Sequence, residues 1–305
     1  MLDVALLGCG GSMPIPQRFL TSLLVSYKGR KILIDCGEGT QVSMKLLAWG
    51  FKSIDVICIT HTHADHVLGL PGLLATIRNS ERTEPITIIG PKGIRKVVEG
   101  LMVIVPYLGF ELHIIEDPTE PFVLDEQLSI HTIELQHTVP CLGYQFRVKR
   151  RRRFDVQKAQ ENNVPKLYWN RLQKGETIKE DGVLYTPDLV LGVARRGIKL
   201  SYITDTRPFP ELIQFVQESD LLICEGMYGS DEDIEKAIRN KHMTFSEAAR
   251  VAKEANADEL ILTHFSPSLF EPEQYLPTTR EIFQNTHLGE DRLTRQLKFK
   301  DKEES

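Results

Sequence analysis

The sequence predicts an α/β protein in which two layers of sheet are covered by helices. Apolar strand patterns alternate with helical spacing along most of the 305 residues. Hydrophobic residues make up 41% and charged residues 26% of the chain, as in an ordinary globular protein. A chain of this length can bury roughly 75% of its unfolded surface, so its core needs no disulfide or structural metal. Sheets and helices of this kind bury their apolar faces by stacking in layers.

The order of the expected elements follows from the apolar spacing. Strands are expected at 2–8, 22–27, 31–35, 55–60, 86–90, 111–115, 128–135, 144–148, 198–203, 221–224 and 260–262. Helices are expected at 38–48, around 70–77, and at 93–104, 246–255 and 278–286. The more polar stretch at about 150–188 is expected to be an insertion carried by a single domain over 1–305.

The sequence shows no sign of export or of a membrane partner. The longest apolar run, residues 101–105, has five residues, against the roughly 20 that a membrane span needs. Asp3 stands where a signal peptide carries basic residues. The five cysteines are scattered singly, which favours reduced thiols and a cytoplasmic location.

Charge is distributed unevenly along the chain. The whole chain has a net charge of −5, but residues 144–200 hold 14 Lys and Arg against six Asp and Glu, a net +8. The remainder is therefore at −13. A basic segment on an acidic protein can bind a polyanion at one place, although a charge run is more often a solvated face.

One short motif concentrates metal-binding side chains. His61-Thr62-His63-Ala64-Asp65-His66 directly follows the apolar strand expected at 55–60. Four of these six residues are imidazoles or carboxylates, which together suit zinc, or failing that manganese or iron. A polar loop with surface histidines is the alternative, and the density of ligand types argues against it.

Three further candidate ligands lie downstream in similar positions. His137, Asp205 and His264 each come just after an apolar strand pattern, where α/β sheets gather functional groups. Each alone can equally be a capping or turn residue. With the motif they supply seven ligands, the number expected for two metal ions that share a bridging carboxylate and a water.

With these residues in view, the chain resembles the metallo-β-lactamase superfamily and, within it, the ribonuclease Z family. The resemblance runs along nearly the whole chain. Besides the His-rich motif it includes residues 35–41, 69–74, 90–93, 205–208 and 241–244.

The resemblance implies a four-layer αββα metallo-β-lactamase sandwich with an inserted basic arm. It implies two Zn²⁺ per subunit, with Mn²⁺ as the other possibility, and it places Asp205 between the two ions. One zinc would be held by His61, His63 and His137, and the other by Asp65, His66 and His264.

The same resemblance assigns roles in catalysis and assembly. Asp65 would accept a proton, and His242 would lie near the scissile phosphate, although it can also be a surface residue at a helix start. The implied substrate is precursor tRNA, whose 3′ trailer would be removed. The implied assembly is a homodimer in which one subunit's arm grips the tRNA for the other's site.

The chemistry of such a site agrees with this assignment. Two zinc ions with two aspartates and a hydroxide leave a charge of about +1, and bound zinc lowers the pKa of water to about 7. Hydrolysis would leave a 3′-hydroxyl on the tRNA and a 5′-phosphate on the trailer.

The basic segment supplies the candidate RNA-binding residues, which are Lys149, Arg150, Arg151, Arg152, Arg153, Lys166, Arg171 and Lys174. Tyr168 and Trp169 can stack on an exposed base or pack the arm against the body, and packing is favoured slightly. Two departures from the family affect substrate preference. Residues 16–19 lack the usual Arg-Asn pair, and residues 164–175 lack the Gly-Pro motif of the docking arm.

Two other functions remain as alternatives. A dinuclear zinc hydrolase of a small phosphodiester, thioester or lactone would share the metals without needing the basic segment. A non-catalytic nucleic-acid-binding relative would not need all seven ligands.

Overall fold

The computed structural model describes residues 1–300, which form two compact units. The larger unit consists of residues 1–147 and 198–298, and the smaller unit of residues 148–197 with Phe299 and Lys300. The domain expected over 1–305 therefore includes five residues, 301–305, that lie outside the described ones. The segment expected as an inserted arm lies within the smaller unit.

The first sheet of the larger unit is mixed. Its strands, in spatial order, are β16 (Leu293–Leu297), β1 (Leu2–Gly8), β2 (Ser22–Tyr27), β3 (Arg30–Ile34), β4 (Ile54–Cys58), β5 (Ile86–Gly90) and β6 (Leu112–Glu116). The β16-β1-β2-β3 part is antiparallel, with Leu6 opposite Leu23, and β3 to β6 run parallel.

The second sheet contains the strands of the later half. In spatial order they are β15 (Thr286–Leu288), β14 (Leu260–Thr263), β13 (Leu221–Glu225), β12 (Arg195–Ile203), β9 (Leu142–Arg150), β8 (Leu128–Glu134) and β7 (Phe122–Val123). Strands β12 to β15 run parallel, so their carboxyl ends meet at one edge.

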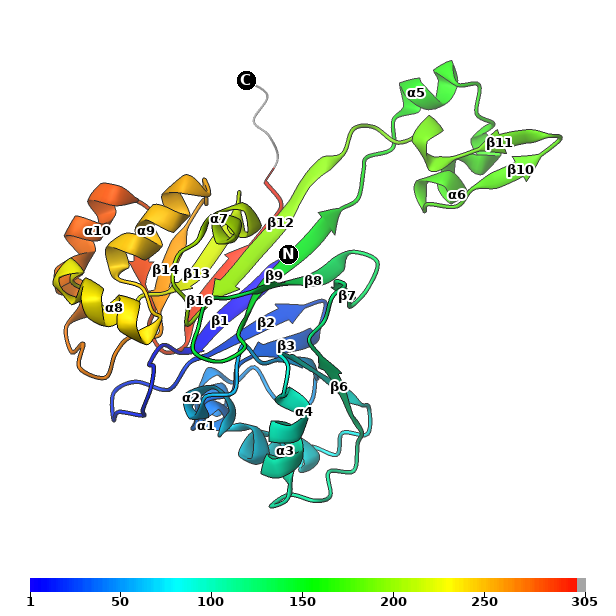
Figure 1. Cartoon of the computed structure of the whole chain (residues 1–305). Coiled ribbons are helices and arrows are strands. Elements are labelled where there is room, and N and C mark those ends of the chain that lie inside the picture. Colours follow the sequence, from blue (N-terminus) through cyan, green and yellow to red (C-terminus); the bar gives the residue numbers. More distant parts are fainter. Residues whose placement is uncertain (301–305) are drawn as a thin grey trace. The chain divides into compact units, whose positions relative to one another are not determined.

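Helices cover the outer faces of the two sheets (Figure 1). Those on the side of the first sheet are α1 (Thr40–Leu47), α2 (Ala64–Val67), α3 (Leu70–Arg78) and α4 (Ile94–Met102). Those on the side of the second are α7 (Pro210–Val216), α8 (Ile234–Asn240), α9 (Phe245–Glu254) and α10 (Leu276–Ile282). The larger unit is therefore the four-layer αββα sandwich that the sequence predicted.

The buried residues explain why these elements stack. In β1, β2 and β4 nearly every residue is buried, as expected for strands between two layers. Their side chains form one apolar core with the inner faces of α3 and α4, including Leu73 and Val98. At about 25 cal/mol per Å² of apolar surface removed from water, this core is the main force that holds these helices on the first sheet.

The smaller unit has a core of its own. It contains α5 (Val156–Glu161), α6 (Trp169–Gln173), the hairpin of β10 (Ile178–Glu180) and β11 (Val183–Tyr185), and short 3₁₀ turns at Lys166–Tyr168 and Pro187–Leu189. Tyr168 packs in this core and donates a hydrogen bond to Glu180. Trp169 packs against it and donates from Nε1 to the Val164 carbonyl at 2.9 Å. Both aromatics pack, as favoured, but against their own unit.

The C-terminal elements differ from the expectation. The helix expected at 278–286 is α10, which ends at Ile282. Phe283 takes an extended backbone (φ −138°, ψ 102°), and Thr286 then begins β15. Strands β15 and β16 and helices α7 and α8 were not expected, because each has seven residues or fewer, which is too short for an apolar period to show clearly.

Among residues 1–300, no helix has the length and apolar character required to cross a membrane.

Candidate metal centre

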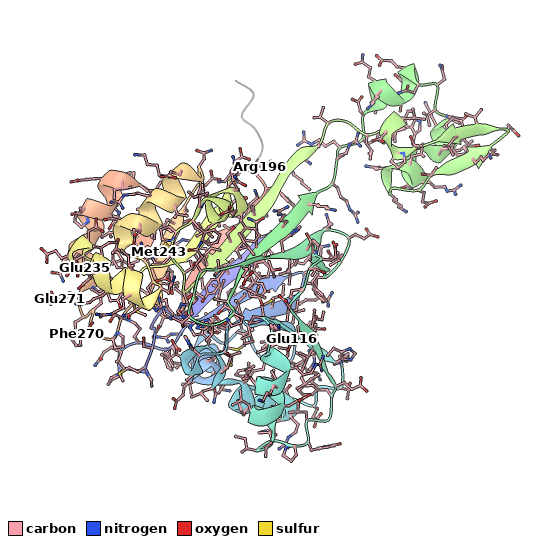
Figure 2. All side chains as sticks on the ribbon, in the orientation of Figure 1. Glu116, Arg196, Glu235, Met243, Phe270 and Glu271 are labelled. Carbon is pink, nitrogen blue, oxygen red and sulfur yellow. The ribbon has the colours of Figure 1, made fainter. Side chains whose placement is uncertain are left out.

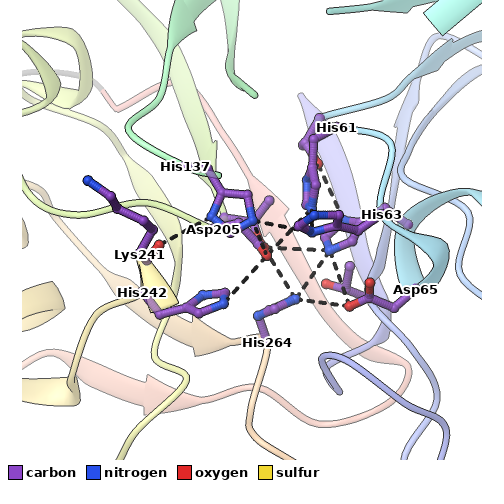
Figure 3. A network of polar contacts seen from close by, with 12 residues as sticks. His61, His63, Asp65, His137, Asp205, Lys241, His242 and His264 are labelled. Carbon is purple, nitrogen blue, oxygen red and sulfur yellow. Dashed lines mark hydrogen bonds and ion pairs between the residues drawn. The ribbon is translucent and has the colours of Figure 1, made fainter. Parts of the chain in front are cut away.

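Strand ends of the larger unit bring the predicted ligands together. His61 follows β4, His137 follows β8, Asp205 follows β12 and His264 follows β14. The rest of the motif continues into α2, which carries Asp65 and His66. In Figure 3 the labelled His and Asp side chains converge on one point, and His66 joins them through its contacts with Asp65 and His264. All seven ligands expected from the sequence therefore lie in one cluster.

The first group of ligand atoms comprises His61, His63, His137 and Asp205. Nδ1 of His63 lies 3.0 Å from Nε2 of His61 and 3.3 Å from Nε2 of His137. Oδ2 of Asp205 lies 3.6 Å from Nε2 of His61 and 3.7 Å from Nε2 of His137.

The second group comprises Asp65, His66 and His264. The Nε2 atoms of His66 and His264 are 3.2 Å apart, and each lies 3.4 Å from Oδ2 of Asp65. Oδ1 of Asp205 lies 3.2 Å from Nε2 of His264 and 3.5 Å from Nε2 of His66. Asp205 thus directs one carboxylate oxygen to each group.

These separations fit metal coordination. At zinc–nitrogen distances of about 2.0–2.1 Å, tetrahedral ligand atoms lie about 3.3 Å apart. The imidazole nitrogens of each group face one another at about that spacing, where protons alone cannot satisfy every lone pair. The donor set of imidazoles and carboxylates suits zinc.

The backbone at the cluster is strained, as functional sites often are. Asp35, Asp205 and His264 have positive φ values of 56°, 45° and 58°, a left-handed conformation that is costly for residues with a Cβ. Gly11 packs against the His264 ring, and a Cβ at Gly11 would lie 2.6 Å from Cε1 of that ring. Tight packing therefore fixes where His264 points.

Hydrogen bonds to the other ring nitrogens orient the ligands. Nδ1 of His66 donates to Asp35 at 2.8 Å, and Asp35 in turn accepts from the backbone N–H and the hydroxyl of Thr60. Nδ1 of His137 donates to the Lys241 carbonyl at 3.3 Å. In both histidines the proton sits on Nδ1, so Nε2 presents a lone pair to the cluster.

Burial sets the protonation of the cluster. It lowers the pKa of His61, His63 and His137, which favours the neutral imidazole that binds metals. Burial opposes the charge on Asp205, but the surrounding histidines outweigh it and hold the pKa of Asp205 well below its usual range. His66 differs: burial opposes its charge, but Asp35 and Asp205 outweigh it and raise the pKa of His66 well above its usual range. The site therefore combines three imidazoles held neutral with an ionised carboxylate, and His66 must give up a proton when a metal binds.

His242 is buried at the edge of the cluster. Its Nε2 lies 3.9 Å from Oδ2 of Asp205, and its Nδ1 lies 3.2 Å from both carboxylate oxygens of Glu225. Burial opposes its charge, but Glu225 outweighs it and raises the pKa of His242 to about 9. Asp205, His242 and His264 are also close enough to form a third possible ligand group.

Glu225 is a site residue that the sequence reasoning missed. It ends β13, is fully buried, and accepts from the backbone N–H groups of Thr206 and Met243 as well as from His242. Its position at a strand end is the signal that identified Asp205 and His264.

A second missed contact holds the His242 loop. Arg207, two residues after Asp205, donates to the His242 carbonyl and pairs with Glu247. Glu247 also completes a capping box with Thr244 at the start of α9. The loop carrying His242 is therefore tied to the end of β12.

A cavity of about 350 Å³ opens above the cluster. Among the residues that line it are His63, Asp65, His137, Asp205, His242 and His264. The ligand cluster is thus reachable from solvent by a substrate group.

The predicted RNA-binding residues occupy several environments in the smaller unit. Arg152 pairs with Asp188 and donates to the carbonyls of Leu191 and Gly192, so its charge is used internally. Arg171 pairs with Glu176 at 2.8 Å on the surface. Lys149, Arg151, Lys166 and Lys174 are exposed.

Arg150 and Arg153 line a cavity of about 650 Å³ in the smaller unit. Three further basic residues line it, namely Arg195, Arg196 and Lys300. Arg195 and Arg196 begin β12, where Figure 2 labels Arg196. The sequence reasoning did not include these three, because they are separated from the basic run by about 40 residues or more.

Solved structures establish the class of protein. Human tRNase Z, short form, has a TM-score of 0.70 and 26% identity, over 97% of this chain and 100% of that chain. The metallo-β-lactamase fold protein YhfI from Bacillus subtilis has a TM-score of 0.71 and 18% identity, over 97% and 100%. Together with the ligand cluster, they define a metal-dependent hydrolase of the metallo-β-lactamase fold.

Sequence relatives narrow the class. Two proteins named ribonuclease Z, from Clostridium kluyveri and Clostridioides difficile, are 56% and 55% identical over 303 residues. The matches cover 99% and 98% of this chain and 100% and 99% of the relatives. Residues 2–275 also match a family model described as anti-Pycsar protein Apyc1. The chain therefore belongs to the ribonuclease Z family and, over residues 2–275, to the family of that model. The predicted fold class and family are confirmed.

Proposed function

We propose that this endoribonuclease removes the 3′ trailer from precursor tRNA with two zinc ions per subunit. The observation that carries the proposal is the pair of ligand groups joined by Asp205, with each carboxylate oxygen 3.2–3.7 Å from imidazole nitrogens of one group. The near-full-length identity to proteins named ribonuclease Z supports it. In this arrangement His61, His63 and His137 hold one ion, Asp65, His66 and His264 hold the other, and Mn²⁺ is the alternative metal.

Bound zinc would supply a nucleophilic oxygen at neutral pH and stabilise negative charge on the phosphate. Asp65 accepts a hydrogen bond at Oδ2 from the backbone N–H of Ser12 at 2.7 Å, which fixes this carboxylate at the cavity wall. In our proposal the same carboxylate takes the proton of the attacking water. Asp65 therefore acts as both ligand and proton acceptor.

His242 donates a proton to the leaving oxygen in this scheme. Glu225 orients its ring from the Nδ1 side, which leaves Nε2 facing the cavity. Cleavage of the bond between phosphorus and the 3′-oxygen leaves a developing alkoxide, and a proton from Nε2 turns it into a hydroxyl. The broken bond assigns the phosphate to the trailer and the hydroxyl to the tRNA.

Mapping the cut on a trailer-bearing precursor tRNA tests the function. We expect a single cleavage at the 3′ end of the mature tRNA, with a 3′-hydroxyl on the tRNA and a 5′-phosphate on the trailer. A substrate with 2′-deoxyribose at the cleaved nucleotide should still be cut, because the 2′-hydroxyl is not the nucleophile. A 2′,3′-cyclic phosphate product would contradict the mechanism.

Bis(p-nitrophenyl) phosphate serves as the comparison substrate. The small-substrate alternative shares the metal ligands, so it predicts efficient turnover of this diester and no cleavage of precursor tRNA. An intact precursor together with efficient turnover of the diester would favour that alternative.

We propose further that the basic residues of the smaller unit bind precursor tRNA through its phosphates. Arg150 and Arg153 are the best placed of the predicted set, since they line a large cavity with three other basic residues. Phosphate contacts raise affinity without reading sequence, so they suit a segment distant in sequence from the catalytic motif.

The homodimer and the cytoplasmic location also belong to this proposal. Val42 and Leu46 lie one turn apart on α1 and are 49% and 62% exposed, and the proposal places the second copy against this small apolar face. All five cysteines are buried and free, which agrees with a reducing compartment. Light scattering on the purified protein tests the dimer, and Leu46→Lys should shift it towards monomer.

A further inference from the structure

The cavity above the ligand cluster extends past the metal-binding groups. Its wall also includes Tyr228, Arg239 and Asn240, which lie outside the ligand groups. A single phosphodiester held at the cluster would leave this part of the wall unused.

Arg239 is the only lysine or arginine among the described residues that line this cavity. The neighbouring cations are already committed, since Arg207 pairs with Glu247 and Lys236 pairs with Asp233. Within residues 1–300, no carboxylate lies at ion-pair distance from Arg239. Its guanidinium is exposed and is available to an anionic ligand.

The wall beside Arg239 is fixed in place. Asn240, the last residue of α8, donates from Nδ2 to the Tyr228 hydroxyl at 2.8 Å. The Tyr228 carbonyl accepts from the backbone N–H of Phe245 at 2.9 Å. The end of the helix that carries Arg239 is therefore joined through Tyr228 to the start of α9.

We propose that Arg239 binds the phosphate immediately 5′ of the scissile phosphate in a polynucleotide substrate. The proposal rests on the function proposed above, in which His242 protonates the 3′-oxygen of the upstream nucleotide. Arg239 precedes His242 by three residues, and the turn between them is tight because Lys241 is left-handed (φ 62°). The upstream nucleotide lies on the His242 side, so its own 5′ phosphate is the nearest second anion.

This subsite defines a class of substrate. A guanidinium can make two parallel hydrogen bonds to one phosphate. A small diester whose single phosphate is held at the ligand cluster has no second phosphate for Arg239 to bind. The substrate that uses the whole cavity is therefore a polynucleotide with at least two consecutive phosphates, whereas bis(p-nitrophenyl) phosphate occupies the cluster alone.

Comparing Arg239→Gln with Lys236→Gln tests the subsite. Both residues are cationic and exposed on α8, but Lys236 does not line the cavity. Arg239→Gln should raise KM for precursor tRNA roughly tenfold, as for loss of a charged hydrogen bond. It should also reduce the slope of log KM against log salt by about 0.7. Lys236→Gln should change neither, and both variants should keep wild-type turnover of bis(p-nitrophenyl) phosphate and wild-type zinc content.

A methylphosphonate placed at one position of a short trailer-bearing RNA identifies the phosphate. Neutralising the phosphate 5′ of the scissile one should raise the wild-type KM about as much as Arg239→Gln does, and should leave the variant unchanged. Additive losses in the double change would overturn the subsite while the proposed function stands. So would a KM of Arg239→Gln for unmodified precursor tRNA that equals the wild-type value. An equal loss on the small diester would show that Arg239 acts through the metal ligands. If the wild type leaves precursor tRNA uncut, the proposed function itself fails.

Discussion

The ligand cluster and the basic run were both visible in the sequence, but the structure treats them differently. Every residue predicted as a ligand lies in one of two adjacent ligand groups, because each follows the end of a strand or lies at the short helix α2 that comes after β4. The basic run at 149–153 has no such constraint. There Arg152 pairs with Asp188, Arg150 donates to the Lys300 carbonyl, and Arg150 and Arg153 both line a cavity.

The difference shows what a sequence pattern can determine. Strand ends of parallel sheets converge, so polar residues at those positions are brought together by the backbone. A run of like charges indicates only that this part of the chain lies near solvent. The position of each arginine depends on residues elsewhere in the chain, such as Asp188 for Arg152 and Glu176 for Arg171.

The largest expected effect tests the sharing of Asp205. Asp205→Ala removes a carboxylate that faces both ligand groups, so both metal ions should be lost or weakened. Turnover of precursor tRNA and of bis(p-nitrophenyl) phosphate should fall by more than about 10³-fold, the upper range for loss of one transition-state contact. Elemental analysis should show fewer than two zinc ions per chain. Full occupancy of two ions would contradict the bridging role.

The next largest effect tests whether His242 acts as a general acid or as a metal ligand. His242→Ala should lower kcat for precursor tRNA by about 10²–10⁴-fold, the usual contribution of a general acid. Glu225→Gln should cause a smaller loss of kcat. The amide oxygen can still accept from Nδ1 of His242, but the second carboxylate oxygen that faces this nitrogen is gone. Zinc content should stay at the wild-type level in both variants. Loss of zinc in His242→Ala would instead make His242 a ligand, as its closeness to Asp205 and His264 allows.

Asp205 and His242 also show which features of the fold and the site can be predicted from the sequence. The layered α/β class was predictable from the long apolar strands, and the seven candidate ligands from the dense motif and the strand ends, whereas His242 came only from the resemblance to the ribonuclease Z family. Glu225 was not singled out, although it ends β13 as Asp205 follows β12, because one carboxylate after an apolar run has many explanations. The Arg207–Glu247 pair spans 40 residues, and its pairing depends on how α9 packs.

The third expected effect distinguishes the arginines of the basic run that line the cavity from Arg152. Arg150→Ser with Arg153→Ser should raise KM for precursor tRNA about tenfold or more. The double variant should also flatten the salt dependence of KM, because RNA binding through fewer phosphate contacts releases fewer counterions. Turnover of bis(p-nitrophenyl) phosphate should barely change.

Arg152→Ser is the matched control for that double variant. Removing it leaves Asp188 and two carbonyls without their partner, so the expected change is a lower stability of the smaller unit. Hydrogen exchange of residues 148–197 measures this directly. If Arg152→Ser changes the salt dependence as much as the double variant does, the cavity residues are not the preferred phosphate contacts.

The smallest expected effect concerns the outer part of the smaller unit. Arg171 was predicted to bind RNA, but it forms an exposed ion pair with Glu176, and such pairs contribute about 0–1 kcal/mol. A phosphate that recruits Arg171 must displace this carboxylate, so its gain is reduced by the pair it breaks. Arg171→Gln should therefore raise KM for precursor tRNA by no more than about twofold. Glu176→Gln releases the guanidinium and should lower KM slightly if RNA passes this surface. An Arg171→Gln loss as large as that of the Arg150 and Arg153 double variant would mean that RNA contacts the outer surface as strongly as the cavity, and that the pair with Glu176 opens when substrate binds.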